Sequence, residues 1–156
     1  MKIHTLHKVQ VVSRPLGEVF SFFEKPENLA MITPPWLGFR ILTPLPVVMK
    51  KDAVFDYSIR VMGLRMRWKS LVSEYRPPHM FVDEQIEGPY RYWRHTHAFA
   101  EVEEGTRITD EIRYAMPFGI LGEIVQRLAM RRQLEAIFAH RARVISEIFE
   151  EEEVVR

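Results

Sequence analysis

The amino-acid sequence predicts an α+β fold in which a curved antiparallel sheet of about seven strands wraps around one long C-terminal helix. Two observations carry this prediction. Between residues 53 and 115 the chain has β-rich, alternating runs separated by short turn signals, as an antiparallel meander does. Beyond Pro117 the apolar residues instead recur at helical spacing. A length of 156 residues is ordinary for one domain, so we expect residues 1–156 to form a single unit.

The N-terminal part predicts one strand followed by two short helices. Residues 3–11 alternate loosely and are rich in β-forming side chains. Ser13 followed by Pro15 is a helix-start signal, and the apolar residues of segment 14–24 have helical spacing. A second short helix is expected over residues 26–32.

A proline-rich loop is expected next. Residues 33–38 contain consecutive prolines, which remove backbone donors and fix φ, so we expect no regular structure there. A strand near residues 39–43 should follow. The alternation of run 64–75 fails near Ser70-Leu71, which predicts a β-bulge. Four turn signals divide the meander: Met62-Gly63, Arg76-Pro77-Pro78, Gly88-Pro89 and Glu104-Gly105.

The helical pattern after Pro117 has a continuous apolar stripe. About thirty helical residues span about 45 Å, which is enough to cross the whole sheet. We expect the acidic run 150–153 at its end to be a frayed, solvated tail, because adjacent like charges repel. The stripe consists of Leu121, Ile124, Val125, Leu128, Leu134, Ile137, Phe138, Ile145, Ile148 and Phe149.

Composition argues against several classes of function. Lys and Arg number 22 against 21 for Asp and Glu, so there is no global field to attract nucleic acid. The chain has no cysteine, which excludes disulfides, thiolate metal sites and a cysteine nucleophile, and suits a reducing cytosol. Residues 1–12 lack the apolar stretch of a signal peptide, and no window approaches a membrane span. We therefore expect a cytoplasmic protein without stable membrane insertion.

Polar side chains lie within an apolar wall on one face of run 90–101. Side chains two apart on a strand share a face, which groups Arg91, Trp93, His95, His97 and Phe99. The two flanking turns then predict what these residues oppose.

A turn at residues 104–105 would place Phe99 opposite Asp110 and His97 opposite Ile112, making His97 and Asp110 diagonal neighbours. On the other side, a turn at residues 88–90 would align a second strand with the same face. Its inward residues Gln85, Asp83 and Phe81 would then oppose Trp93, His95 and His97 respectively.

Three interpretations of this polar set remain open. His95, His97, Asp110 and Gln85 either form a satisfied structural network or orient the polar end of a ligand in a cavity. The two histidines and Asp110 also have the composition of a two-histidine, one-carboxylate metal site, although the spacing is nonspecific. A histidine oriented by Asp110 could act as a general base.

The segment 84–99, EQIEGPYRYWRHTHAF, followed by Gly105-Thr106, Asp110, Tyr114 and Pro117, resembles the ligand-binding members of the START-like, or SRPBCC, superfamily. That superfamily includes polyketide cyclases and the Bet v 1 allergens. The motif Gly-Pro-x-x-x-Trp-x-His-x-His-x-Phe is the most specific part and is similar to a bacterial, cyclase-like subgroup. The likeness covers nearly the whole chain, because a first strand, two short helices, a six-strand meander and a long terminal helix match the helix-grip order.

The resemblance implies a pocket between sheet and terminal helix that accommodates a small apolar or aromatic molecule, such as a lipid or polyketide, in a START-like ligand-binding domain. Two other functions stay open: a cyclase, isomerase or hydrolase that uses His97, His95 and Asp110 for proton transfer, and a protein-interaction domain, such as a homodimer, with a vestigial pocket. We assign no catalytic residue, metal ligand or cofactor. The candidate ligand-binding residues are Tyr57, Trp68, Phe81, Gln85, Trp93, His95, His97, Phe99, Asp110, Ile112 and Tyr114.

Overall fold

The structure is a computed structural model that describes the backbone of residues 1–154 and the side chains of residues 1–150. One sheet of seven antiparallel strands, in the order β1-β7-β6-β5-β4-β3-β2, forms most of the molecule. The strands are β1 (His4–Val12), β2 (Arg40–Ile41), β3 (Val54–Val61), β4 (Leu64–Arg76), β5 (Met80–Glu87), β6 (Tyr92–Val102) and β7 (Gly105–Ala115).

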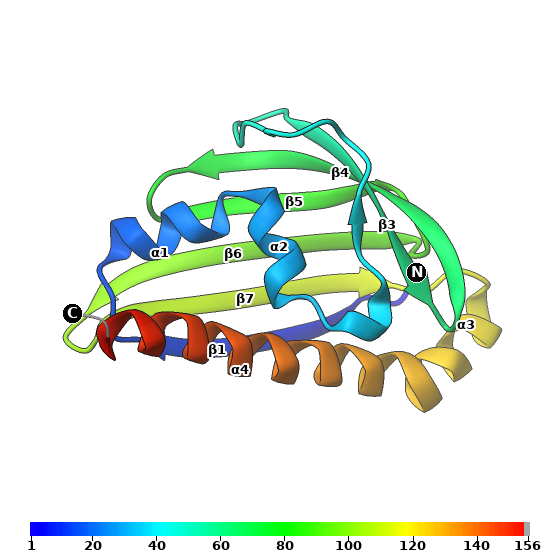
Figure 1. Ribbon diagram of the computed structural model, residues 1–156. Helices are drawn as coiled ribbons and strands as arrows, with labels where there is room; N and C mark the ends of the chain where they lie inside the picture. Colours follow the sequence, from blue (N-terminus) through cyan, green and yellow to red (C-terminus); the bar gives the residue numbers. More distant parts are fainter. Residues whose placement is uncertain (155–156) are drawn as a thin grey trace.

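The helices lie on one side of this sheet. In Figure 1, α4 (Arg131–Val154) runs along β1 and β7, while α1 (Leu16–Phe23) and α2 (Pro26–Ile32) lie between it and the far strands. α4 contacts both β1 and α2. The predicted helix-grip fold, with two short helices after the first strand, is therefore confirmed. No helix within residues 1–154 is long and apolar enough to cross a membrane.

The predicted long C-terminal helix is present, but it contains a π-helical turn that was not predicted. It begins as α3 (Gly119–Val125), passes through a π-helical turn, η2 (Gln126–Met130), and continues as α4. Val125 and Met130, five residues apart, pack in the same core cluster, because a π turn places positions i and i+5 on one face. The predicted stripe residues Leu121 and Leu128 are instead 70% and 68% exposed.

Two local predictions differ from the backbone of the structure, and part of the second concerns side chains that the structure does not describe. The segment 33–38 contains a 3₁₀ turn, η1 (Pro35–Leu37), because proline is tolerated in the first turn of a helix. Gly38, with φ of 55°, ends it in the left-handed conformation. The acidic run 150–153 is helical rather than frayed in its backbone, since α4 extends to Val154. The predicted solvation of that run concerns side chains outside the described residues, apart from the exposed Glu150.

The register of the central strands positions the site. As predicted, Phe81 pairs with His97 and Asp83 with His95. On the β7 side the prediction was wrong by two residues, since His97 pairs directly with Asp110. The reason is a tighter turn, in which Val102 pairs with Gly105 and only residues 103–104 are unpaired. A shift by two keeps every side chain on its predicted face.

The predicted bulge in β4 is present, with register shifts after Lys69 and after Val72. The core has two apolar clusters, both of which include residues of β6. Trp93 belongs to one and Phe99 to the other. His95 and His97 alternate with outward-facing residues between them, so the strand carries both rings into the interior between the two clusters.

Candidate functional site

His95 and His97 form the centre of a buried polar network on β6. Each is only 6% exposed, and their rings stack with centroids 3.6 Å apart. The ring of Phe81 stacks on the other side of His97 at 4.2 Å. Because the two histidines are two positions apart on one strand, they share a face and lie next to each other.

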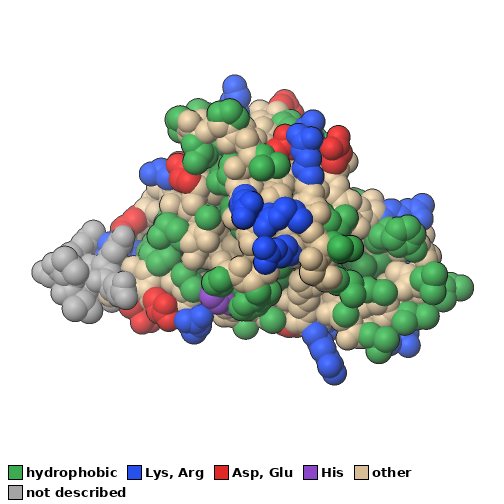
Figure 2. All heavy atoms as spheres, turned by 45° about the vertical axis from the view of Figure 1, so that its right-hand side comes forward, with side chains coloured by type: hydrophobic (Ala, Val, Ile, Leu, Met, Phe, Trp, Pro, Cys, Tyr) green, Lys and Arg blue, Asp and Glu red, His purple; other side chains and the backbone are tan. Residues whose placement is uncertain are grey.

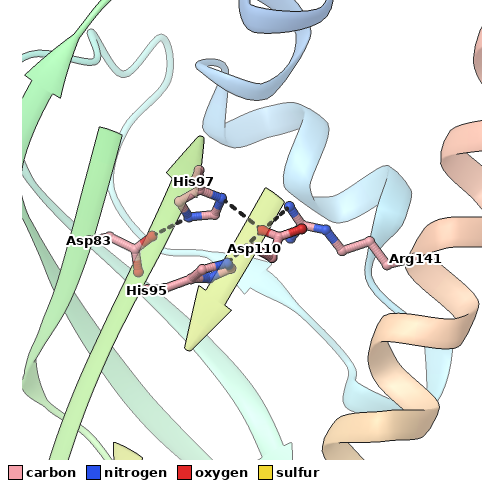
Figure 3. A network of polar contacts seen from close by, with 5 residues as sticks. All are labelled: Asp83, His95, His97, Asp110 and Arg141. Carbon is pink, nitrogen blue, oxygen red and sulfur yellow. Dashed lines mark hydrogen bonds and ion pairs between the residues drawn. The ribbon is translucent and has the colours of Figure 1, made fainter. Parts of the chain in front are cut away.

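Each histidine contacts a carboxylate on a neighbouring strand (Figure 3). Nε2 of His95 lies 2.7 Å from Oδ1 of Asp110, and Nε2 of His97 lies 2.6 Å from Oδ2 of Asp83. Nδ1 of His97 is 3.4 Å from Oδ1 of Asp110, which is an ion-pair contact without hydrogen-bond geometry. The network therefore joins β5, β6 and β7.

Arg141 completes this network from α4 and was not predicted. Its Nη2 lies 3.5 Å from Oδ1 of Asp110. Its guanidinium packs on the rings of Phe23 and Phe138, with Cζ 5.4 Å and 5.5 Å from their centroids. Arg141 occupies the helical phase between the buried Phe138 and Ile145, and this interruption of the apolar stripe is the signal that could have identified it.

The two histidines differ in protonation. Burial and the charge of His97 lower the pKa of His95 to about 4, despite its bond to Asp110. Burial also lowers the pKa of His97, but its contacts with Asp110 and Asp83 outweigh burial and raise it. His95 is thus neutral and its Nε2 donates to Asp110, whereas His97 is the more basic of the two rings.

Both carboxylates are ionised. Burial raises the pKa of Asp110, but Arg141 and the histidines outweigh this and hold it well below its usual value. Burial likewise opposes ionisation of Asp83, and the hydrogen bond from His97 reverses the shift. The charges of the two carboxylates are opposed by Arg141 and by the hydrogen bonds from the two histidines. That balance is what makes its burial tolerable.

A cavity of about 170 Å³ lies beside the network. Its wall comes from β3 to β6, from α1 and α2, and from α4 and the preceding turn η2, and most of the side chains that line it are apolar. Among the candidate ligand-binding residues, those that line it are Tyr57, Trp68, Phe81, Trp93, His95 and His97. Asp83, Ser70 and Arg141 also line it and were absent from the candidate set.

Five candidate residues lie outside the cavity lining. The side-chain amide of Gln85 donates to the backbone oxygen of Tyr90 at 2.7 Å and accepts from its N–H at 3.1 Å, which closes the β5–β6 turn. The Tyr114 hydroxyl accepts from Nε2 of Gln126 at 3.1 Å. Asp110 contacts the lining residues His95, His97 and Arg141 but does not itself line the cavity. Phe99 and Ile112 belong to the apolar clusters.

Four buried polar atoms on lining residues have no hydrogen-bond partner among the described residues: Trp68 Nε1, Ser70 Oγ, His97 Nδ1 and Arg141 Nε. Buried polar groups in folded proteins are nearly always paired with protein, water or ligand. Trp68 Nε1 and Arg141 Nε are donors, and the Ser70 hydroxyl can donate or accept. The cavity wall can therefore donate hydrogen bonds to an oxygen inside it.

A metal-binding arrangement is less well matched. Asp83, rather than Asp110, joins His95 and His97 in a group whose potential ligand atoms lie within 4.8 Å of one another. Yet the Nε2 atoms of the two histidines are bonded to different carboxylates. The geometry is that of a hydrogen-bonded network.

Comparison with solved structures shows the fold. A protein from Mycobacterium smegmatis, Ms6760, is 16% identical with a TM-score of 0.69, over 95% of this chain and 92% of its own. Major latex-like protein 151 from Panax ginseng is 13% identical with a TM-score of 0.67, over 94% and 97%. The di-domain ARO/CYC StfQ from the steffimycin biosynthetic pathway is 17% identical with a TM-score of 0.73, over 97% of this chain and 52% of its own. No curated protein matches the chain.

Family membership is shown by a match to a sequence model. The family described as polyketide cyclase / dehydrase and lipid transport matches residues 12–138, which is most of the chain. Its matched region begins at the end of β1 and includes every strand of the meander and the cavity-lining part of α4 up to Phe138. The chain belongs to the polyketide cyclase/dehydrase and lipid-transport family.

Proposed function

We propose that the chain binds a small apolar or aromatic molecule that carries one oxygen acceptor, in the cavity between the sheet and α4. The observation that carries the proposal is an apolar wall that also contains buried polar atoms without a hydrogen-bond partner among the described residues. An apolar cavity of about 150 Å³ is large enough to hold benzene. The volume of about 170 Å³ therefore suits a body the size of one aromatic ring.

The polar side of the site explains why an oxygen is expected. Trp68 Nε1 and Arg141 Nε are buried donors without a protein partner among the described residues, and a carbonyl, hydroxyl or carboxylate oxygen can accept a hydrogen bond from either. A ligand without an acceptor would leave these donors unpaired. We expect the site to discriminate between molecules of the same shape that differ only at this oxygen.

Two matched probes test this proposal. Acetophenone and α-methylstyrene have nearly the same shape, but only acetophenone has a carbonyl oxygen. Titration followed through the indole N–H resonances should show acetophenone shifting the Trp68 signal and binding more tightly. Trp68→Phe should weaken acetophenone binding about fivefold, the contribution of one hydrogen bond, and leave α-methylstyrene unchanged.

Trp36→Phe is the control, because Trp36 is exposed and does not line the cavity. It should change neither affinity. If neither probe binds, or if Trp68→Phe affects both probes equally, the proposal is wrong.

A second candidate function is proton transfer on a bound carbonyl compound. The observation in its favour is that neighbouring histidines in the cavity wall have pKa values shifted in opposite directions, which separates a neutral base from a charged acid. Asp110 would orient the pair. Deuterium incorporation from solvent into the methyl group of acetophenone measures this activity. His95→Gln should abolish the incorporation while retaining binding, and exchange at the wild-type rate in that variant would exclude the proposal.

A further inference from the structure

The β3–β4 hairpin ends in an exposed apolar tip. Val61 pairs with Leu64, so Met62 and Gly63 form a two-residue turn, and both have positive φ, 50° and 82°. Such turns favour Asn-Gly, because a bulky side chain at positive φ is strained. Met62 nevertheless occupies the first position and is 62% exposed, with Leu64 beside it 71% exposed. The hairpin therefore carries an exposed apolar side chain at a turn position whose positive φ disfavours a bulky residue.

Three arginines, Arg40, Arg60 and Arg65, lie on the strands of this hairpin and on the adjacent β2, and have no carboxylate partner among the described side chains. Arg60 and Arg65 lie one residue beyond Val61 and Leu64 and pair across the two strands. A Cβ atom at Gly38 would lie 2.9 Å from Nη2 of Arg65 and 3.5 Å from Nε of Arg60, so both guanidinium groups reach the same point. Desolvation and the charges of Arg40 and Arg60 lower the pKa of Arg65. None of the three forms an ion pair with any residue whose side chain the structure describes.

A second exposed apolar segment has the same character. Phe118, which precedes α3, is 83% exposed and has a φ of 65°, another strained position for a bulky residue. Ile120 is 81% exposed. The exposed Arg127, Arg131 and Arg132 follow along the helix and form no ion pair with the described side chains.

The two segments lie at one end of the molecule. Val61 at the hairpin tip and Val125 in α3 pack against the same core cluster. Figure 2 shows hydrophobic side chains gathered on the right of this face and a group of Lys and Arg side chains near its centre. We call the exposed set the apolar rim: Met62, Leu64, Phe118, Ile120, Leu121 and Leu128.

We propose that the apolar rim docks on an anionic membrane surface, with the rim side chains entering the boundary of the acyl chains and the neighbouring arginines contacting lipid phosphates. Apolar side chains bordered by Lys or Arg are the pattern of interfacial binding. Arginines that lack protein carboxylates are complementary to phosphates. A protein partner of mixed surface charge would not require six arginines without counter-ions.

Docking of this kind would place the cavity close to the lipid. Ile59 and Val61 line the cavity from the inner side of the same hairpin, and Met130 lines it from the turn that follows α3. The docking proposal stands on the surface alone. The idea that ligand passes between membrane and cavity rests also on the proposed function.

Vesicle co-sedimentation tests the docking. The protein should bind vesicles of phosphatidylcholine containing about one third phosphatidylserine, and bind pure phosphatidylcholine vesicles much less. Each arginine near an anionic surface strengthens binding about fivefold, so Arg60→Gln/Arg65→Gln should weaken it about 25-fold. Met62→Ser/Leu64→Ser should weaken binding by a similar factor, because two apolar side chains no longer enter the interface.

Arg76→Gln/Arg107→Gln is the matched control, because it removes the same charge from exposed positions in other strand segments. Its binding should equal that of the wild type. Equal loss in both arginine pairs, or no difference between the two vesicle types, would overturn the proposal. Dimerisation seen by light scattering and abolished by the rim substitutions, without vesicle binding, would assign the surface to a second copy instead. Acetophenone binding is measured without lipid, so failure of the proposed function is distinguished from failure of docking.

Discussion

Nε2 of His97 lies 2.6 Å from Oδ2 of Asp83, and this contact holds a proton in the interior of the sheet. Its neighbour His95, stacked at 3.6 Å, is neutral because burial and, next, the charge of His97 lower its pKa. The two histidines therefore titrate as a coupled pair. The pH dependence of stability follows from this coupling.

The coupled pair predicts a stability maximum near pH 6.5. The folded-state pKa of His95 is about 4, below its unfolded value of 6.5, so the unfolded chain takes up this proton first. Stability should fall by up to about 3 kcal/mol as the pH decreases from 6.5 to 4. The pKa of His97 is raised, so its stabilisation is complete below 6.5 and is lost as the pH rises through the folded-state pKa.

Urea denaturation between pH 4.5 and 9 measures this dependence. His95→Gln should remove the acid-side decrease above pH 4, and His97→Gln should remove the alkaline-side decrease. His7→Gln, at an exposed position of β1, should retain the wild-type profile. Identical profiles for all four proteins would show that the pair does not carry the pH response.

Gln85 should contribute to stability and not to binding. Its amide forms two hydrogen bonds with the backbone of Tyr90, and it does not line the cavity. Gln85→Ala should lower the free energy of unfolding by about 1–2 kcal/mol and leave acetophenone affinity unchanged. Glu87→Ala, at an exposed position of the same strand, should change neither quantity. A loss of affinity in Gln85→Ala at unchanged stability would return this residue to the ligand site.

Strand alternation explains why most of the site could be predicted. Side chains two apart share a face, so Trp93, His95 and His97 were grouped correctly even though the β6–β7 register was displaced by two residues. Gln85 shows where this reasoning ends. Strand alternation places Gln85 on the inward face of the sheet. The residue lies beside a turn, however, whose backbone needs hydrogen-bond partners, and alternation alone does not reveal that need.

Long-range packing explains what could not be predicted. Arg141 appears in the sequence as one more charge in a helix rich in arginine, and only the approach of α4 to β7 brings it to Asp110. The π turn is equally hidden, because an apolar stripe counted at α-helical spacing includes Leu121 and Leu128. One inserted residue per turn rotates α3 relative to α4 and leaves both leucines exposed.

Met62→Asn should separate folding from docking. Asparagine accepts positive φ more readily than methionine, so the strain at φ 50° should decrease and stability should rise by about 1 kcal/mol. The same change removes an apolar side chain from the tip and should weaken binding to anionic vesicles. Leu64→Asn, on a strand residue without positive φ, should weaken vesicle binding with no gain in stability. If Met62→Asn stabilises the protein but binds vesicles as the wild type does, Met62 takes no part in docking.

The contact between Asp110 and Arg141 should show strong energetic coupling. Asp110→Asn or Arg141→Met alone leaves a buried charge without its partner and should cost about 3–5 kcal/mol of unfolding free energy. The double variant removes both charges, so its loss should be smaller than the sum of the single losses by about 1–3 kcal/mol.

The exposed pair Arg143 and Glu147, at 3.1 Å on the same helix, provides the control cycle. Its coupling, from Arg143→Met and Glu147→Gln, should be only about 0.3–0.5 kcal/mol, because water screens exposed charges. If Arg141→Met alone does not fold, Arg141→Lys can take its place in the cycle. Lysine keeps the charge but loses the planar contact with Phe23 and Phe138, so it perturbs the protein less. Additive losses at Asp110 and Arg141 would mean that the 3.5 Å contact contributes no coupling energy to stability. The histidines alone would then keep the Asp110 carboxylate ionised.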